Sequence, residues 1–506
     1  MRPTFMGFET AKRGLMVNQK ALDIVGNNIG NMGVTGYTRQ RVDQVSLSTQ
    51  GMTSRYSLEP HILAGQGSAI NGVSQVRDPY LDKRYRQEFA DVGKFDKMTE
   101  VLTDVETALD EYESDGGMAT AIQKMFKAIE SMSMAGGNTT TNANIVRTSA
   151  KSMTQVLKQF DVKLNNVIDQ QKYDLELNVD HVNSLLERVA SLNESIQRDM
   201  FSAEGGKGSY FGPNELLDER NVLLDELSKF GDINVQTKTD GTVTVKMGTH
   251  EVVSGTKAET VSYVKNDDNT VSVTWQSTGK DVELDTGSIF ASIAMINGRG
   301  PAATAGTNEN YERGVPYYKD QIDTMAKTIA SAFNGVIPEM DANGEPIKDK
   351  LGNVTYKQLF TFEDGKKQGA GSITITEAWD KDSTYMMTPT SADGKDDNKY
   401  YLSMISLFKN DIDFGNGFKG TMEGYVKNYN TTLSEDKTFN TSRLSASAAI
   451  SDNLLDSISQ VSGVSMDEEG ADMMAYNKVY AAMGRIMTSL DEALDVLINR
   501  TGVVGR

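Results

Sequence analysis

A long stretch without a single glycine or proline constrains the fold of this chain more than any other feature. The stretch runs from about Asn142 to Ala203, although the chain of 506 residues contains 45 glycines and 9 prolines. Glycine and proline are the residues that most readily interrupt a helix. Apolar residues recur there every three or four positions, first as Met153, Leu157, Phe160, Leu164 and Val167, then in a new phase as Val182, Leu185, Val189, Leu192 and Ile196. A helix this long predicts an elongated bundle.

Both ends of the chain carry apolar residues at heptad spacing. Near the start, Phe8, Leu15, Leu22 and Ile29 lie seven apart, and Ala11, Asn18 and Val25 fill the other positions of an a/d seam, where Asn18 is a polar residue of the kind that sets register. Near the end, one helical stripe consists of Met473, Tyr476, Tyr480, Met483, Met487, Leu490, Leu494 and Leu497. Ser465 and Glu468 stand at capping-box spacing before that stripe. Both ends are therefore predicted to form coiled-coil strands.

The charges of the two ends predict that they meet. Residues 1–42 hold the basic residues Arg2, Lys12, Arg13, Lys20, Arg39 and Arg41 against Glu9 and Asp23. Residues 465–506 carry an excess of acidic side chains. Opposite charge on two seams favours their association.

A polar, turn-prone segment follows the first seam, from Asn27 to Gly36. Asparagine and glycine adopt turn and left-handed conformations easily, so we expect Asn27, Asn28 and Asn31 to end the helix and redirect the chain. We predict an assembly interface made of the seam residues and this joint, comprising Phe8, Leu15, Asn18, Leu22, Val25, Ile29, Asn27, Asn28, Asn31, Tyr476, Tyr480, Met483, Met487, Leu490, Leu494 and Leu497. Such ends are expected to be mobile in a monomer and helical in an assembly.

The middle of the chain alternates helical and strand patterns. Helical spacing links Phe95, Met98, Leu102, Val105, Leu109 and Tyr112, and later Ile322, Met325, Ile329 and Phe333. Two hairpins are expected, one around Asp240 and Gly241 and one around residues 267–269. A last helical run is expected to share a face made of Leu444, Ala448, Leu455 and Ile458. The predicted class is mainly α, an elongated multidomain α+β chain with a β-hairpin-rich section projecting outward from a long-helix bundle.

Composition argues against several functional classes. The formal net charge of −19 argues against nucleic-acid binding, which needs clustered Lys and Arg. The chain has no cysteine and only three histidines, His61, His181 and His250, which excludes disulfides and Cys/His zinc sites. No apolar run reaches the length of a membrane span, and the first residues lack the apolar core of a secretory signal. We therefore expect no membrane association, and no catalytic, cofactor-binding or metal residues are assigned.

Two motifs resemble ligand sites without their context. Gly415, Gly417 and Gly420 match a dinucleotide-binding pattern, but no strand and βαβ unit surround them, so a loop between helices is expected. The segment from Asp341 resembles a calcium loop, but Pro346 stands where glycine is required, which favours a tight turn.

The two ends together resemble a known group of proteins. The segment "GLMVNQKALDIVGNNIGNMGVTGYTRQRV" is similar to the N-terminal signature of bacterial flagellar rod, hook and hook-associated proteins, and the closing helix is similar to theirs. The segments "NELLDERNVLLDELSKFGDINVQTKTDGTVTVKMG" and "YYKDQIDTMAKTIASAFN" resemble the family of the first hook-filament junction protein. That resemblance implies a non-enzymatic structural subunit of the hook-filament junction, exported through the flagellar type III apparatus to the extracellular flagellum.

The resemblance also implies partners and a domain division. The implied partners are hook protein, the second junction protein, further copies of the chain in a ring, and an export chaperone. We expect a terminal coiled-coil domain of residues 1–50 with 463–506, a long-helix domain of 51–231 with 286–340 and 372–462, and a β-rich section of 232–285. Residues 341–371 are expected to form a small insert where family members often carry a larger outer domain.

Three other functions stay open on the sequence. A flagellar hook or distal rod protein shares the terminal signatures. A peptidoglycan hydrolase lacks any recognisable frame of catalytic carboxylates or nucleophile. A secreted adhesin, in which the β-rich section binds a host surface, is neither supported nor contradicted by the sequence.

Overall fold

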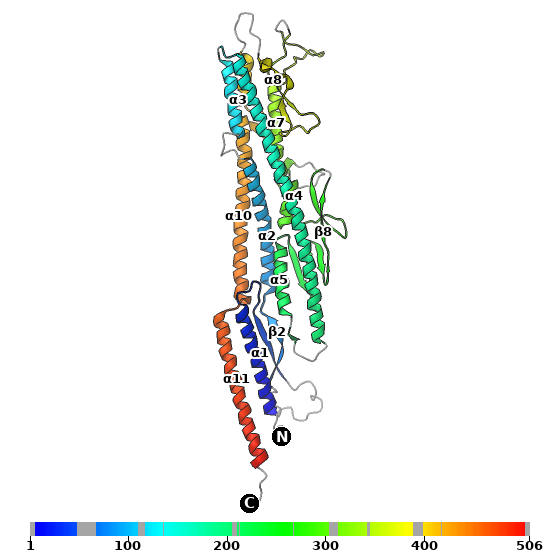
Figure 1. Cartoon of the computed structure of the whole chain (residues 1–506), viewed down its shortest axis with the longest axis vertical. Helices are drawn as coiled ribbons and strands as arrows, with labels where there is room; N and C mark the ends of the chain where they lie inside the picture. The colour runs from blue at the N-terminus through cyan, green and yellow to red at the C-terminus, as the bar shows by residue number, and fades with distance from the viewer. Residues whose placement is uncertain are drawn as a thin grey trace, which may run out of the picture.

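The computed structural model describes residues 6–47, 67–109, 117–134, 136–204, 210–211, 213–266, 268–302, 312–341, 345–387, 398–415 and 417–500. Long helices run along one axis, short strands lie to one side, and the first and last helices lie at the same end (Figure 1). Helices dominate and the sheets are small, which confirms the mainly α prediction. Within these ranges, no helix combines the length and apolarity that a bilayer crossing demands.

The body of the molecule is built from helices that pack side by side. Helix α10 packs along α2, and α4 packs against α3, α5, α6 and α7. Their bounds are α2 Pro79–Ala108, α3 Met118–Ser133, α4 Thr140–Glu204, α5 Asn214–Ser228, α6 Ser288–Asn297, α7 Val315–Asn334, α8 Glu377–Lys381, α9 Lys399–Lys409 and α10 Met422–Ser462. The stretch without glycine and proline lies within a single helix of 65 residues, as predicted.

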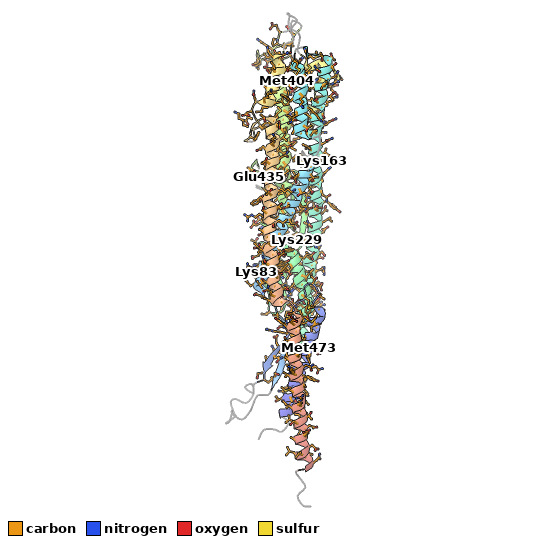
Figure 2. All side chains as sticks on the ribbon, turned by 90° about the vertical axis from the view of Figure 1, so that its left-hand side faces the viewer. Lys83, Lys163, Lys229, Met404, Glu435 and Met473 are labelled. Carbon is orange, nitrogen blue, oxygen red and sulfur yellow. The ribbon has the colours of Figure 1, made fainter. Side chains whose placement is uncertain are left out.

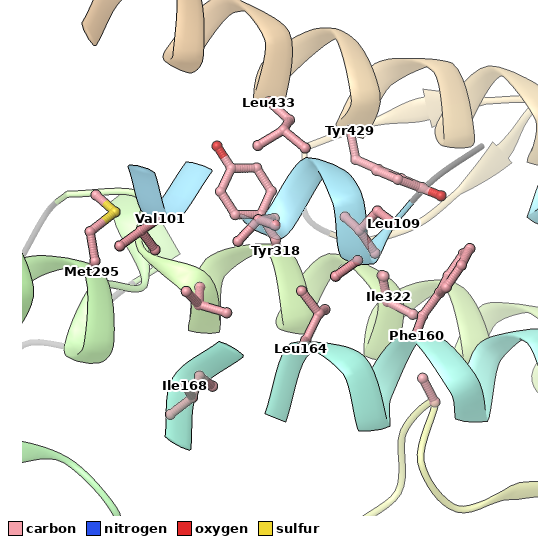
Figure 3. Close-up of a cluster of buried hydrophobic side chains, with 14 of the residues drawn as sticks. Val101, Leu109, Phe160, Leu164, Ile168, Met295, Tyr318, Ile322, Tyr429 and Leu433 are labelled. Atoms are coloured by element: carbon pink, nitrogen blue, oxygen red, sulfur yellow. The ribbon is translucent and has the colours of Figure 1, made fainter. Parts of the chain in front are cut away.

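The core lies where these helices face one another. Val101 of α2, Phe160 of α4, Tyr318 of α7 and Tyr429 of α10 meet there (Figure 3). The predicted row of α7 is buried throughout, and the predicted row of α2 is buried from Met98 to Leu109, with Phe95 half-buried. Tyr112 lies outside the described residues.

The predicted face of α10 is wrong in part. Leu455 is 43% exposed, and Leu444, Ala448 and Ile458 are only half-buried. The buried row of this helix instead includes Leu433, Ser447, Ser451 and Leu454. Because serine carries little weight in an apolar periodicity, the buried row of α10 lies about one residue away from the predicted one.

Both predicted hairpins are present in the β-rich section. Strands β4 (Ile233–Thr237) and β5 (Val243–Met247) pair antiparallel around Gly241, which has φ 78°, and β8 (Val261–Lys265) pairs with β9 (Val271–Trp275). The short strands β6 (His250–Ser254) and β7 (Lys257–Ala258) extend the first hairpin to a sheet in the order β4-β5-β6-β7, which the sequence did not reveal.

The two motifs that resembled ligand sites lie in segments that connect helices. Strands β12 (Ile412–Asp413) and β13 (Lys419–Gly420) form a small hairpin that contains the glycine-rich loop between α9 and α10. At the second motif, the backbone N–H of Glu345 donates to the Asp341 carboxylate at 2.9 Å, and residues 342–344 lie outside the described ranges. A further pair of strands, β10 (Phe360–Phe362) and β11 (Ile373–Ile375), follows this segment.

The two ends of the chain pack on each other below the body. Helix α1 (Met6–Asn31) contacts α11 (Met466–Asp495), which continues into a π-helical turn at Val496–Arg500. Helix α1 also contacts β1 (Gln40–Ser46) and β2 (Ser68–Gln75), and β2 pairs in parallel with β3 (Tyr210–Phe211). Viewed from the side, α11 extends beyond the body, with Met473 in its upper part (Figure 2). We call α1 and α11 the terminal helix pair.

Candidate assembly interface

The terminal helix pair meets in one antiparallel register that repeats every seven residues. A Cβ on Gly7 would lie 3.2 Å from Leu490 Cδ1, and a Cβ on Gly14 would lie 3.1 Å from Met483 Sδ. Seven residues further along α1 the same register places Ala21 opposite Tyr476. At the next step, Asn28 Nδ2 donates to Glu469 Oε2 at 3.1 Å. Small residues of α1 thus face large side chains of α11.

The predicted seam of α1 is displaced by one residue from this facing row. Phe8, Leu15, Leu22 and Ile29 are half-buried, and each follows a residue of the row that faces α11. Ala11, Asn18 and Val25 are buried as predicted. Apolar bulk marks the row of Phe8, Leu15 and Leu22, whereas close packing of two helices favours small residues on one side. The glycines at heptad spacing were the signal that could have located the contact.

The predicted stripe of α11 is only partly covered. Tyr476, Met483, Met487, Leu490 and Leu494 are half-buried. Met473, Tyr480 and Leu497 are 38%, 39% and 51% exposed. Among the described residues of α11, Glu469 alone is buried. One partner helix therefore leaves most of the surface of α11 uncovered.

Asn28 uses its whole side-chain amide at the joint between α1 and β1. Its Nδ2 donates to the Gln40 carbonyl at 2.9 Å as well as to Glu469, and its Oδ1 accepts from the Gln40 N–H at 3.0 Å and from the Tyr37 hydroxyl at 2.8 Å. The side chain is 1% exposed. A fully satisfied buried amide specifies one arrangement, because any other leaves polar groups unpaired.

The other asparagines of the segment have different roles from those predicted. Asn27 and Asn28 belong to α1, which ends at Asn31, so they do not form the turn. Asn31 Nδ2 donates to the carbonyl and side-chain oxygens of Asn27 at 2.9 and 2.8 Å, and Asn27 Nδ2 donates to the Tyr37 hydroxyl at 3.3 Å. Asn18 donates to the Gly14 carbonyl of its own helix at 2.7 Å. Its described hydrogen bond therefore does not cross to α11.

Arg39 links β1 and the joint to the first turns of α11. Its Nε and Nη1 donate to Glu469 at 2.6 Å and to Glu468 at 2.7 Å, and its Nη2 lies 3.4 Å from Asp472. Its backbone N–H donates to the Ser462 carbonyl at the end of α10 at 2.8 Å. Burial alone would lower the pKa of Arg39, but Glu469 and Glu468 outweigh burial and raise it. The predicted attraction between a basic start and an acidic end is made at this residue.

The predicted capping box of α11 does not form. Ser465 occupies the N-cap position, but its side chain makes no capping hydrogen bond. Glu468 pairs instead with Arg39, because a charge-assisted bond to a guanidinium is stronger than one to a backbone amide.

The turn after α1 fits against α5. Gly36 has φ 82°, and a Cβ there would lie 2.3 Å from Val222 Cγ2 of α5. Asp218 of α5 accepts from the Thr38 N–H at 3.3 Å and from Gln75 Nε2 at 2.8 Å. Burial raises the pKa of Asp218, and these hydrogen bonds offset part of that shift. A groove of about 660 Å³ lies between this turn, α5, the end of α10 and the start of α11.

The sequence reasoning did not single out Arg39, Tyr37 or Glu469 as site residues. Arg39 and Glu469 were visible only as members of the two charge imbalances. Tyr37 stood within the quoted signature, and a tyrosine beside three asparagines offered a hydroxyl for them to bond. The described residues contain no group of three or more His, Cys, Asp or Glu side chains placed to hold a metal ion.

Known proteins are similar to this chain along its whole length. Residues 102–349 match the family described as the flagellar hook-associated protein FlgK helical domain, and residues 8–38 match the flagella basal body rod protein family. Flagellar hook-associated protein 1 of Bacillus subtilis is 29% identical over 532 residues, which covers 100% of both chains. The protein of the same name from Salmonella typhimurium is 22% identical and covers 97% of this chain and 98% of its own.

A solved structure is also similar. The flagellar hook junction protein FlgK from Burkholderia pseudomallei is 17% identical, with a TM-score of 0.43, over 56% of this chain and 47% of that one. The rod-protein match coincides with α1 and the turn that follows it, and the helical-domain match begins within α2 and ends after α7. With full-length relatives of one name and a domain match in the middle, the chain is similar along its whole length to the flagellar hook-associated protein 1 (FlgK) family, which confirms the resemblance seen in its sequence.

Proposed function

We propose that this chain is a non-enzymatic structural subunit at the hook-filament junction of the extracellular bacterial flagellum. Relatives along its whole length carry the name flagellar hook-associated protein 1. The observation that supports an assembly role most directly is the surface of α11. Met474, Val479 and Ile486 are 62%, 40% and 46% exposed, on a helix with a single buried residue among those described. Exposed apolar surface of this extent is typical of a contact with another subunit.

In this proposal the terminal helix pair is a coiled coil that is completed by neighbouring copies. The glycine row of α1 allows close packing with α11 on one face, and the uncovered faces of both helices supply contacts between subunits. Met16 of α1, 59% exposed, lies on such a face. The elongated body formed by α2, α4 and α10 carries the β-rich section away from the coiled coil. The domain boundaries predicted from the sequence are part of this proposal.

The proposed partners are those that the family resemblance implies. Further copies of the chain would pack around the terminal helix pair to form a ring, with hook protein on one side and the second junction protein on the other. An export chaperone would cover α11 before assembly, because an uncovered amphipathic helix exposes apolar side chains in the cytoplasm. Order in the free subunit is tested by comparing amide exchange of α1 and α11 in monomer and in isolated hooks.

A motility experiment tests the role. A strain that expresses the chain without residues 465–506 is expected to assemble hooks but to shed or lack filaments. The double variant Val479→Asp with Ile486→Asp should give the same defect while the body stays folded, because it places charge on the outer face of α11 only. Asn477→Asp adds one negative charge at an exposed polar position of this helix and should leave swimming unchanged. Normal filaments in the truncated strain would contradict the proposal.

Electron microscopy of detached hooks separates this role from that of a hook or rod protein. A junction subunit is expected as a thin ring at the distal end of the hook. A tube built from many copies of the chain would show the alternative.

A further inference from the structure

A pocket of about 250 Å³ opens where the body begins, between the start of α2, α5 and the sheet of β4 and β5. It is separate from the contact between the terminal helices, although Arg77 lines both this pocket and the groove at the joint. Its charged lining residues are Arg77, Asp82, Lys83, Arg86 and Arg220. Four of these five are basic, in a chain whose net charge is −19.

Arg220 is the unusual member of this set. The residue is 4% exposed, and its Nη1 donates to Asn193 Oδ1 at 2.9 Å and to the Gly241 carbonyl at 2.7 Å. Both acceptors are neutral, and its Nε has no hydrogen-bond partner among the described residues. Burial, with a smaller effect of Arg86, lowers the pKa of Arg220 to about 10. The guanidinium is therefore charged at neutral pH and has no carboxylate partner among the described residues, which is a costly state for a buried charge.

The acidic groups nearby are already used by the other arginines. Arg77 Nε donates to Asp82 Oδ2 at 2.6 Å, and Arg86 Nε donates to Asp225 Oδ1 at 2.7 Å. Lys83 also lies near Asp232, whose pKa is raised mainly by burial while Lys83 offsets part of that shift. With these pairs counted, Arg220 keeps an uncompensated charge. The start of α2 at Pro79 also lines the pocket, and the positive end of its helix dipole adds to that field.

We propose that this pocket binds inorganic phosphate as the counter-charge of Arg220 and Lys83. A tetrahedral oxyanion accepts hydrogen bonds from guanidinium and ammonium groups. Asp82 lines the same pocket, and its Oδ1 has no partner among the described residues. Phosphate near neutral pH retains a proton that it can donate to such a carboxylate oxygen, whereas sulfate has none. The pocket should therefore prefer phosphate to sulfate. A bound phosphate would tie α2, α5 and the β4–β5 sheet together beside the joint.

The experiment compares anions on the full-length chain at constant ionic strength. Calorimetric titration with sodium phosphate at pH 7 is expected to show saturable binding, with a parallel rise in Tm. Sodium sulfate should bind at least about tenfold more weakly, because the Asp82 oxygen then faces an acceptor. Equal binding of the two anions, or no saturable binding of phosphate, would overturn the proposal.

Variants identify the pocket as the site. Arg220→Gln should weaken phosphate binding by about tenfold or more. Lys83→Gln keeps the fold intact because Lys83 is exposed, so it tests the site even if Arg220→Gln fails to fold. Lys83 lies at the lower end of the body (Figure 2). Lys257→Gln removes an exposed lysine at the far edge of the same sheet and should bind phosphate as the native chain does. An equal loss in Lys257→Gln and Lys83→Gln would show that phosphate only screens surface charge, which overturns the assignment.

Discussion

Asn28 and Glu469 are separated by 441 positions in the chain, yet the Asn28 amide donates to the Glu469 carboxylate at 3.1 Å. Each is 1% exposed. The second oxygen of Glu469 accepts from Arg39, so a buried carboxylate is held from two directions by residues at the opposite end of the sequence. The first and last segments are therefore coupled at the joint, in addition to their packing along the helices.

Removing the Asn28 amide should loosen the joint. In Asn28→Ala the backbone N–H and C=O of Gln40 lose their partners, and each unpaired buried group costs about 1–3 kcal/mol. We expect the free energy of local opening, measured by amide exchange in residues 20–31, to fall by about 2–4 kcal/mol. Gln19→Ala, at an exposed position of α1, should change it by less than about 0.5 kcal/mol. Unchanged protection in Asn28→Ala would show that the joint does not depend on this amide.

Removing the Arg39 guanidinium should lower the free energy of unfolding more than removing the exposed guanidinium of Arg41. Arg39→Ala leaves Glu469 buried without its cation, which typically costs about 3–5 kcal/mol. The matched control is Arg41→Ala, because the Arg41 side chain is 69% exposed and lies 3.5 Å from Asp43, so its loss should cost at most about 1 kcal/mol. Urea unfolding followed by circular dichroism measures both. Similar values for the two variants would mean that Glu469 finds water or another partner.

Enlarging a glycine of the facing row should separate the terminal helices. Gly14→Leu places new atoms against Met483, and overpacking of this kind costs about 1–3 kcal/mol. Gly30→Leu on the same helix meets nothing within 4 Å, so it should stabilise α1 through its higher helix propensity. Met483→Ala should restore stability to Gly14→Leu by vacating the space. Thermal unfolding of the native chain, Gly14→Leu, Met483→Ala and the double variant gives a double-mutant cycle. Additive effects of the two substitutions on stability would contradict the proposed contact.

Alkaline pH should weaken the joint through Tyr37. Burial, with smaller effects of Asp218, Glu215 and Glu469, raises the pKa of Tyr37 to about 12. Between pH 10 and 12 the unfolded chain loses the phenolic proton while the folded chain keeps it, so the free energy of unfolding falls as pH rises. Tyr37→Phe has no such proton, so the stability difference between native and variant should shrink from pH 10 to pH 12. Tyr85, whose pKa is also raised to about 12, is present in both and cancels. A pH-independent difference would exclude this titration.

The fold could be predicted from the sequence wherever one chemical type marked one face. The helix of α4 follows from an uninterrupted apolar period, and the hairpin of β4 and β5 follows from alternation around an Asp-Gly turn. Strands β6 and β7 were not predicted, because the two valines of β6 are adjacent instead of alternating and β7 has only two residues. The face of α10 was misplaced because its buried row includes Ser447 and Ser451, and apolar periodicity ignores serine.

The candidate site could be located but not assembled from the sequence. Heptads and charge imbalance identified the two ends and predicted that they meet. The residues that hold the joint were not identified, because their pairing depends on the path of the chain between Asn28 and Gln40. A local sequence does not state that Glu469 will be buried while Glu468 stays exposed. The spacing of seven residues between Gly7 and Gly14 carried the missing information on which face of α1 approaches α11.

The repeated row of small residues on α1 has a consequence for how the ends find each other. A slip of α11 by one heptad would again set a glycine against a large aliphatic side chain, so the apolar contacts tolerate more than one alignment. The hydrogen bond from Asn28 to Glu469 and the fork of Arg39 exist in only one of them. Registers of α1 and α11 that differ by one heptad therefore share their apolar packing, and only one of them makes the polar contacts at the joint. The two helices can pair through the apolar row first and then settle in the register that Asn28 and Arg39 select.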